Sequence, residues 1–347
     1  MAKIPTSVIG IDLGRYSLKS VRLQRRGSDR YSITHFASRI LADPVENADQ
    51  LGRELKALLK EMGGTARTCA VAVSAPEALI RIIEQPATPV ELLREALRLN
   101  GVALLNQDCK EFVIDCDEIP TSDNANHREP GDSPRNRYLV GGLPRAQVAQ
   151  IGAALEKNKA AVRTMQLAPI CSFNAFEFTH PEVFNNSGFF LVDIGHSNST
   201  MMVGVKRELV LVRTIEFGGS GLAEALIGLS GEPRESVFNA LDQEDEVMVE
   251  YTRVALNALV REIQSSIGFL EHQRDQTIDR VFVSGGVAKS RTLLKVMAEE
   301  LGLPTESWTA VEKCENNVAS DRRRGLEEKA MDLNVACGAA AELLKAN

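Results

Sequence analysis

The chain has 347 residues, of which 44% are hydrophobic and 25% charged, as expected for a globular protein of two or three domains. Its net charge of -7 argues against nucleic acid as the main partner, because binding a phosphate backbone needs a positive surface. The six cysteines lack the paired spacing of a zinc site and are expected to be reduced thiols of a cytoplasmic protein. No apolar run is long enough to span a membrane, so any membrane role is expected to depend on a partner.

The first segment alternates strand-like runs with a single helical one. Three strands are predicted at 7–13, 18–25 and 31–40, followed by a helix at 45–62 and a short buried strand at 69–73. Gly27-Ser28-Asp29 is predicted to be a hairpin turn between the second and third of these strands.

Residues 79–163 have the pattern of a separate small α+β module. Its predicted strand, helix, strand, strand and helix lie at 79–83, 89–100, 111–115, 138–142 and 144–158. Thr88 and Glu91 have the spacing of a capping box, which predicts the start of the first helix. Residues 121–137 carry almost nothing apolar and are predicted to form a loop.

The second half repeats the opening order. Three strands are predicted at 189–194, 200–205 and 208–215, and a glycine-rich turn leads into a helix from Leu222. A long helix is predicted at 245–272, with one buried stripe formed by Val249, Leu256, Leu259, Ile263, Ile267 and Leu270. The remaining elements are a strand and glycine turn at 280–288, a helix ending near Leu301, and a final helix at 332–345 that is rich in small residues.

The same short motif closes the first strand of each half. Asp12-Leu13-Gly14 and Asp193-Ile194-Gly195 each end an apolar strand and precede small or hydroxylated residues. Glycine allows a sharp turn that presents backbone N–H groups, and an aspartate at a strand end suits a hydrated divalent cation. Each aspartate alone could equally be a turn former. Two such turns, half the chain apart, favour two related halves that grip one phosphate tail.

These motifs resemble the phosphate and adenosine motifs of the actin/Hsp70/sugar-kinase ATPase superfamily. The adenosine motif is matched by Ser284-Gly285-Gly286-Val287-Ala288, and 164–176 and 334–343 take the places of its two connecting helices. The resemblance implies an α/β actin-like fold, a duplicated ribonuclease H-like architecture with two lobes.

Within the superfamily, the inserted module is similar to that of the cell-division protein FtsA and of the PilM family of type IV pilus assembly proteins. The PilM-like segments are Asp12-x-Gly14 with Lys19, 111–115, 216–219, 262–269 and 301–304. This resemblance implies a cytoplasmic, nucleotide-binding scaffold of a type IV pilus or a related secretion system. Its partner would be the N-terminal cytoplasmic peptide of a PilN-like inner-membrane protein, which would hold it at the inner membrane.

The resemblance also implies a division of the chain. The first actin-like subdomain would comprise 1–78, 164–186 and the helix 334–347, and the FtsA/PilM-type inserted subdomain would comprise 79–163. The second actin-like subdomain would comprise 187–230 and 276–333, with a small helical subdomain at 231–275.

By resemblance, the phosphates of ATP or ADP would lie between two sets of residues. One set is Gly14, Tyr16, Ser17 and Lys19, and the other is Gly195, His196, Ser197, Asn198 and Thr200. Asp12 and Asp193 would hold Mg²⁺, largely through water. Room for the nucleoside and the α-phosphate would come from Gly218, Gly219, Gly285 and Gly286. Lys19 as a solvated strand residue and His196 as a polar loop residue remain alternatives.

Three departures from the superfamily pattern bear on hydrolysis. Arg15 and Tyr16 replace small hydroxyl residues in the first turn, and Ala168 stands where ATP-hydrolysing relatives have an acidic residue before the proline. No lysine occurs between Lys206 and Lys289, where relatives place one near the ribose. The expected behaviour is nucleotide binding with slow or absent hydrolysis and no assigned catalytic residue.

Two other functions fit the same superfamily. A small-molecule kinase would need an acidic general base beside the acceptor hydroxyl, and no convincing candidate is present. An FtsA-like division protein would polymerise, so self-association is a further possibility, but a C-terminal amphipathic helix is not evident.

Overall fold

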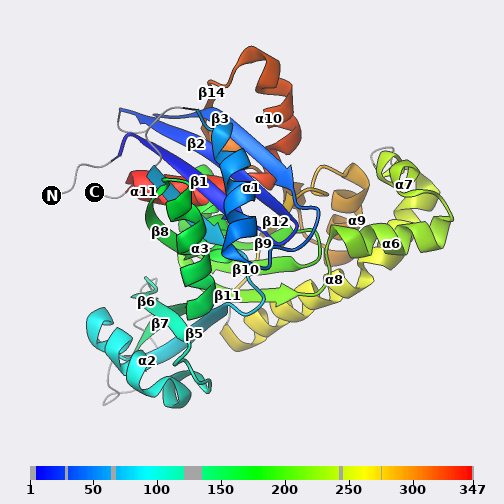
Figure 1. Cartoon of the computed structure of the whole chain (residues 1–347). Coiled ribbons are helices and arrows are strands. Elements are labelled where there is room, and N and C mark those ends of the chain that lie inside the picture. The colour runs from blue at the N-terminus through cyan, green and yellow to red at the C-terminus, as the bar shows by residue number, and fades with distance from the viewer. Residues whose placement is uncertain are drawn as a thin grey trace. The chain divides into compact units, whose positions relative to one another are not determined.

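The computed structural model describes residues 5–27, 30–63, 68–120, 135–241, 245–274 and 276–345 (Figure 1). The chain divides into two units. Unit 1 comprises 1–178, 311–326 and 335–347, and unit 2 comprises 179–310 and 327–334.

Unit 1 is built on a six-stranded sheet with the order β14-β3-β2-β1-β4-β8. The strands are β1 (Ser7–Leu13), β2 (Ser17–Arg26), β3 (Arg30–Ile40), β4 (Thr68–Val73), β8 (Ala161–Leu167) and β14 (Glu315–Asn316). The central strand β1 runs antiparallel to β2 and parallel to β4. Strand β2 also runs antiparallel to β3, which confirms the predicted hairpin of these two strands, although residues 28 and 29 of its turn lie outside the described residues.

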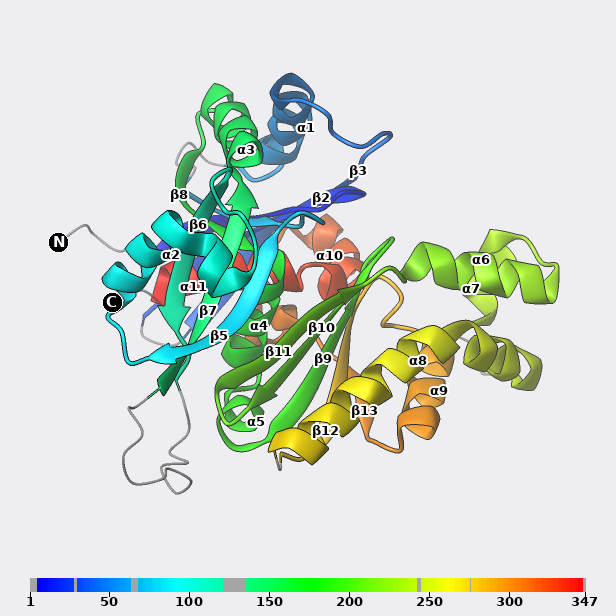
Figure 2. The same ribbon diagram turned by 90° about the horizontal axis from the view of Figure 1, so that it is seen from below.

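The helices of unit 1 bury the faces of this sheet. They are α1 (Ala48–Lys60), α3 (Arg145–Lys157), α4 (Ala168–Thr179) and α11 (Asn334–Lys345). Helices α1 and α3 lie side by side and share a core with β1 and β4 (Figures 1 and 2). The small residues of α11 allow close approach, because a Cβ on Gly338 would lie 1.8 Å from the carbonyl oxygen of Cys171 in α4.

A second, three-stranded sheet in unit 1 has the order β5-β7-β6. Its elements are β5 (Leu79–Pro86), α2 (Val90–Leu105), β6 (Phe112–Glu118) and β7 (Arg135–Pro144). Helix α2 covers one face, and Figure 2 shows it crossing the strands. This layer has its own core, which includes Leu93, Leu97, Ile114 and Tyr138. The following helix, α3, packs on α1 instead.

Unit 2 repeats the arrangement of the large sheet. Its five strands have the order β11-β10-β9-β12-β13. They are β9 (Gly188–Ile194), β10 (Ser199–Val205), β11 (Glu208–Ile215), β12 (Arg280–Gly285) and β13 (Thr305–Ser307). Strand β9 runs antiparallel to β10 and parallel to β12, as β1 does with β2 and β4. The duplication expected from the two aspartate motifs is therefore confirmed.

The helices of unit 2 are α5 (Pro181–Asn186), α6 (Gly219–Ser230), α7 (Arg234–Ala240), α8 (Glu246–Arg274) and α9 (Arg291–Leu301). The predicted stripe of α8 is buried against the sheet as expected. Helix α10 (Arg323–Lys329) and short 3₁₀ turns at Ala310–Lys313, Ser320–Arg322 and Ala330–Asp332 complete the fold. Across the described ranges, no helix is both long and apolar enough to cross a membrane.

Several predicted boundaries were wrong. The connecting helix expected from Thr164 begins at Ala168, because the residues before it extend the sheet as β8. The Thr88 hydroxyl donates to Pro86 O at 2.6 Å instead of capping α2, whose N-cap is Pro89. Helix α2 continues to Leu105 through a non-helical Asn100.

The predicted loop at 121–137 is only partly testable. Strand β7 already begins at Arg135, so the last residues of that loop are strand. The rest of the loop, 121–134, lies outside the described residues.

Candidate functional site

The first aspartate turn connects β1 to β2 in unit 1. Asp12 is 3% exposed and lies opposite Lys19 across the hairpin. Lys19 Nζ is 3.5 Å from Asp12 Oδ2. A buried carboxylate needs such a partner, so Lys19 has a role at Asp12 beyond that of a solvated strand residue.

The turn itself is tight at its glycine. A Cβ on Gly14 would lie 2.7 Å from Ser17 O, so any larger residue would open the turn. Tyr16 O accepts a hydrogen bond from Leu41 N at 2.9 Å, which fixes the backbone of the turn. The Tyr16 side chain is 41% exposed, and Arg15 is exposed beside it.

The second aspartate turn, in unit 2, has the same position in its sheet. Thr200 of β10 lies opposite Asp193, as Lys19 lies opposite Asp12. Ser284 of β12 pairs in register with Asp193, and its hydroxyl donates to Asp193 Oδ1 at 2.9 Å. This hydrogen bond fixes the carboxylate at the carboxyl end of the strand, where α/β folds place their ligands.

The backbone of the second turn is closed by its own hydrogen bonds. Gly195 N donates to Asn198 O at 3.0 Å, and Ser197 is exposed at the tip. Ser199 Oγ donates to Phe217 O at 2.6 Å and so holds the turn against the segment that leads to α6.

Two glycine segments pack directly against this turn. Gly219 N donates to Gly195 O at 2.8 Å, and a Cβ on Gly218 would lie 2.5 Å from His196 O. Gly285 has φ +99° and a Cβ there would lie 2.1 Å from Ile194 O. Unit 2 therefore brings together the second turn, the start of α6 and the glycine turn after β12. That these turns bind phosphate stays a prediction.

Sequence reasoning missed two side chains that lie beside these turns. Ser284 opens the predicted adenosine motif but was given no role of its own, although its place beside a glycine pair was a visible signal. Asp332 has its Oδ1 3.4 Å from where a Cβ of Gly286 would lie. No local signal points to Asp332, because only the fold brings it to the glycine turn.

The electrostatics of the second turn favour an uncharged histidine at neutral pH. Burial lowers the pKa of His196, and the charge of Arg234 lowers it further against an opposing effect of Glu224. The parts of the chain that the structure describes contain no group of three or more His, Cys, Asp and Glu side chains that could hold a metal ion. Each aspartate turn offers a single carboxylate, which suits Mg²⁺ because that ion keeps most of its water.

Comparison with solved structures supports the actin-like fold. The chain is similar to the PilM-PilN type IV pilus biogenesis complex, with TM-score 0.79 and 20% identity over 99% of this chain and 100% of that chain. It is also similar to the ethanolamine utilization protein EutJ from Carboxydothermus hydrogenoformans, with TM-score 0.55 and 14% identity over 99% and 90% of the two chains. The nucleotide-free diol dehydratase-reactivating factor gives TM-score 0.56 and 8% identity over 99% and 100%. At such identities the likeness establishes the fold alone.

The family is established by the sequence itself. No curated protein matches the chain. A family model described as type IV pilus assembly protein PilM matches residues 10–343, which is nearly the whole sequence. The chain therefore belongs to the PilM family of type IV pilus assembly proteins.

Proposed function

We propose that the chain is an assembly scaffold that binds the N-terminal cytoplasmic peptide of a PilN-like inner-membrane protein. The observation that carries this proposal is the family match over 10–343, together with full-length likeness to a complex of PilM with PilN. The inserted layer of β5, α2, β6 and β7 with the adjoining part of unit 1 is the proposed receptor. A kinase or a polymerising division protein is not favoured by the family match.

Binding to such a partner would place the chain on the cytoplasmic side of the inner membrane. The test is co-sedimentation of the purified chain with inner-membrane vesicles that contain the PilN-like partner. We expect sedimentation with these vesicles and none with vesicles whose partner lacks its N-terminal tail. Equal sedimentation with both kinds of vesicle would refute the proposal.

The second part of the proposal concerns ATP or ADP with Mg²⁺. Asp12 and Asp193 would each hold water of the hydrated cation, and the two glycine-rich turns would donate backbone N–H groups to phosphate oxygens. The ligands proposed at the first turn are Gly14, Tyr16, Ser17 and Lys19, and those at the second are Gly195, His196, Ser197, Asn198 and Thr200. Gly218, Gly219, Gly285 and Gly286 would leave room for the nucleoside and the α-phosphate. A Cβ at Gly218 or Gly285 would collide with the backbone of the second turn, at His196 O and Ile194 O respectively.

Hydrolysis is expected to be slow. A nucleotide-cleaving site needs a group that positions the attacking water, and Ala168 at the start of α4 is 6% exposed and cannot do so. We expect phosphate release from Mg-ATP to stay close to the uncatalysed background in a continuous phosphate assay. Turnover of several molecules per second would contradict this expectation.

A further inference from the structure

The three-stranded sheet of unit 1 has two outer strands, β5 and β6. The N–H and C=O groups of each residue in these strands point either toward the central strand β7 or toward the outer edge of the sheet. Ile119 N donates to Arg137 O at 2.9 Å and Arg145 N donates to Glu111 O at 2.7 Å, so the odd-numbered residues of β6 and β7 bond to each other. Successive residues of an antiparallel strand point their backbone groups to opposite sides. The even-numbered residues of β6, and by register those of β5, therefore face the outer edges.

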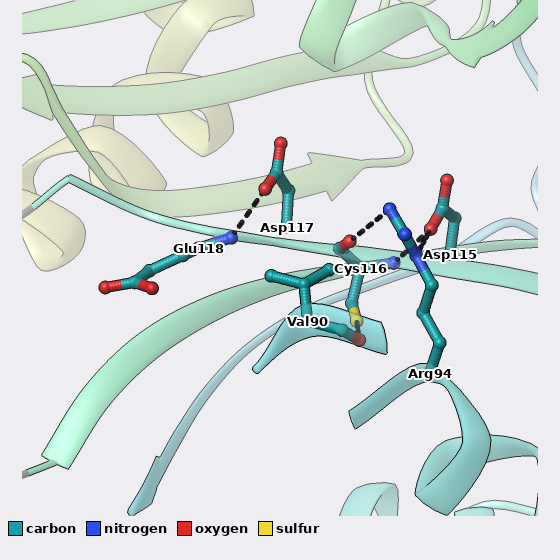
Figure 3. Close-up of polar contacts among 6 residues, drawn as sticks. All are labelled: Val90, Arg94, Asp115, Cys116, Asp117 and Glu118. Atoms are coloured by element: carbon teal, nitrogen blue, oxygen red, sulfur yellow. Dashed lines mark hydrogen bonds and ion pairs between the residues drawn. The ribbon is translucent and has the colours of Figure 1, made fainter. Parts of the chain in front are cut away.

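Side chains occupy part of the outer edge of β6, as Figure 3 shows around Cys116 and Glu118. Asp115 Oδ1 accepts from Cys116 N at 2.8 Å, and Asp117 Oδ1 accepts from Glu118 N at 2.9 Å. Arg94 of α2 donates to Cys116 O at 3.3 Å and is held in place by its ion pair with Asp115. Both outward groups of Cys116 and the N–H of Glu118 are therefore already used.

Phe112, at the start of β6, also has both of its outward backbone groups bonded. Phe112 N donates to Cys109 O at 3.0 Å, and Arg145 Nη2 donates to Phe112 O at 3.0 Å. Within the described ranges, the outward groups of β6 that make no hydrogen bond are then those of Ile114 and the carbonyl of Glu118, which offer few partners to a further strand. Strand addition at β6 is therefore disfavoured.

The outer edge of β5 is largely open. Ile80, Ile82 and Glu84 face outward, and within the described ranges neither backbone group of Ile82 makes a hydrogen bond. The N–H groups of Ile80 and Glu84 are likewise unbonded among the described residues. Among the described residues, the Ile80 carbonyl accepts a hydrogen bond only from the Arg81 side chain at 2.9 Å, and the Glu84 carbonyl only from the Arg135 side chain at 3.1 Å. Both arginines are exposed and easily displaced.

A second copy of the chain is a poor occupant of this edge. Copies related by a two-fold axis pair antiparallel, and centring the pairing on Ile82 would place Glu84 opposite Ile80. If the pairing were centred on Arg81 instead, the two Arg81 side chains, which carry the same charge, would lie opposite each other. If it were centred on Ile83, Ile80 would lie opposite Pro86, which has no N–H to donate. A different extended peptide avoids all three conflicts.

We propose that the outer edge of β5 binds an extended peptide as an added strand. This inference rests on the proposed function, in which that peptide is the N-terminal tail of a PilN-like partner. Main-chain hydrogen bonds to Ile82 would align the peptide, and apolar side chains would lie against half-buried Ile80 and Ile82. An acidic peptide side chain would pair with Arg81 and a basic one with Glu84, which together set direction and register.

The chain offers a matched pair of variants for the test. Glu84 and Glu118 are both exposed glutamates with outward N–H groups, one on each edge. Proline in such a position removes an outward donor and spares the ladder inside the sheet. We expect Glu84→Pro to weaken binding of the fluorescent tail peptide by about tenfold, and Glu118→Pro by less than about twofold. Circular dichroism of both full-length variants checks that they fold.

A second measurement tests which backbone amides of the tail peptide take part in binding. N-methylation of every tail residue in turn should weaken binding at alternate positions, because only every second amide of an added strand faces β5. Wild-type affinity of Glu84→Pro, or a methylation profile without a period of two residues, would overturn the inference and leave the proposed function standing. Absence of any binding by the wild-type chain would instead refute the proposed function, and this inference with it.

Discussion

Asp12 and Asp193 occupy the same position in two sheets but have different surroundings. Asp12 faces Lys19, whereas Asp193 faces Thr200 and accepts a hydrogen bond from Ser284. The positive charge beside Asp12 is thus the ammonium group of Lys19, whereas the residue opposite Asp193 in its hairpin is the uncharged Thr200. Asp193 is therefore the carboxylate on which Mg²⁺ binding should depend more strongly.

Replacing Asp193 by asparagine tests this difference. Asparagine can still accept the Ser284 hydrogen bond but lacks the charge that holds the hydrated cation. For the wild type, Mg-ATP at about one hundred times its dissociation constant should stabilise the fold by roughly 2.7 kcal/mol in a thermal-shift titration. We expect Asp193→Asn to lose most of that shift. Asp279→Asn should keep it, because Asp279 precedes β12 and its Oδ2 accepts from Gly188 N at 3.3 Å, at the start of β9 and away from the second turn. Equal shifts in both variants would exclude the assigned role.

Gly285, at the end of β12 where the glycine turn begins, is a position where no side chain fits. Its φ of +99° and the 2.1 Å approach to Ile194 O mean that Gly285→Ala should lower the free energy of unfolding by at least about 2 kcal/mol. Gly228 of α6 has no atom within 4 Å of the place that a Cβ would occupy, so Gly228→Ala should instead stabilise by about 0.5–1 kcal/mol. Urea unfolding measures both changes, and equal stability of the two variants would show that the glycine turn is not constrained.

At the scale of elements, sequence periodicity predicted what is local and missed what depends on neighbours. The hairpins and the stripe of α8 follow from alternation and helical spacing, so they were predicted correctly. The helix predicted at 164–176 was wrong over 164–167, because these residues form the end of β8 through pairing with β4. The side-chain bonds at the β6 edge around Cys116 could not be predicted, because Arg94 reaches Asp115 only once α2 has packed on the sheet.

Close packing of α4 and α11 gives an element-scale prediction. A Cβ on Gly338 would lie 1.8 Å from Cys171 O, so Gly338→Ala must push the two helices apart. We expect a loss of about 1–3 kcal/mol in unfolding free energy, as for other overpacked cores. Gly152 of α3 has open space around it, and Gly152→Ala should be neutral or stabilising in the same denaturant titration. A stable Gly338→Ala variant would contradict the close crossing.

At the scale of the whole molecule, three histidines make stability depend on pH. Burial is the main cause that lowers the pKa of His35, His180 and His196 below the ordinary 6.5. The unfolded chain then binds protons at a higher pH than the folded chain, so stability is retained above pH 6.5 and lost as the pH falls below it.

Thermal melts between about pH 7.5 and about pH 5.5 measure this effect. We expect the melting temperature to fall across that range, and the triple variant His35→Gln, His180→Gln, His196→Gln to show a flatter dependence. An unchanged melting temperature in the wild type would show that these histidines titrate normally in the folded state.

The family assignment and the two-unit fold converge on a protein that recruits a partner, and recruitment can be measured directly. Isothermal titration calorimetry of the full-length chain with the N-terminal tail peptide of the PilN-like partner is the decisive measurement. The account predicts saturable binding of one peptide per chain and no heat from a scrambled peptide of the same composition. Equal heats from both peptides, or none from either, would contradict it.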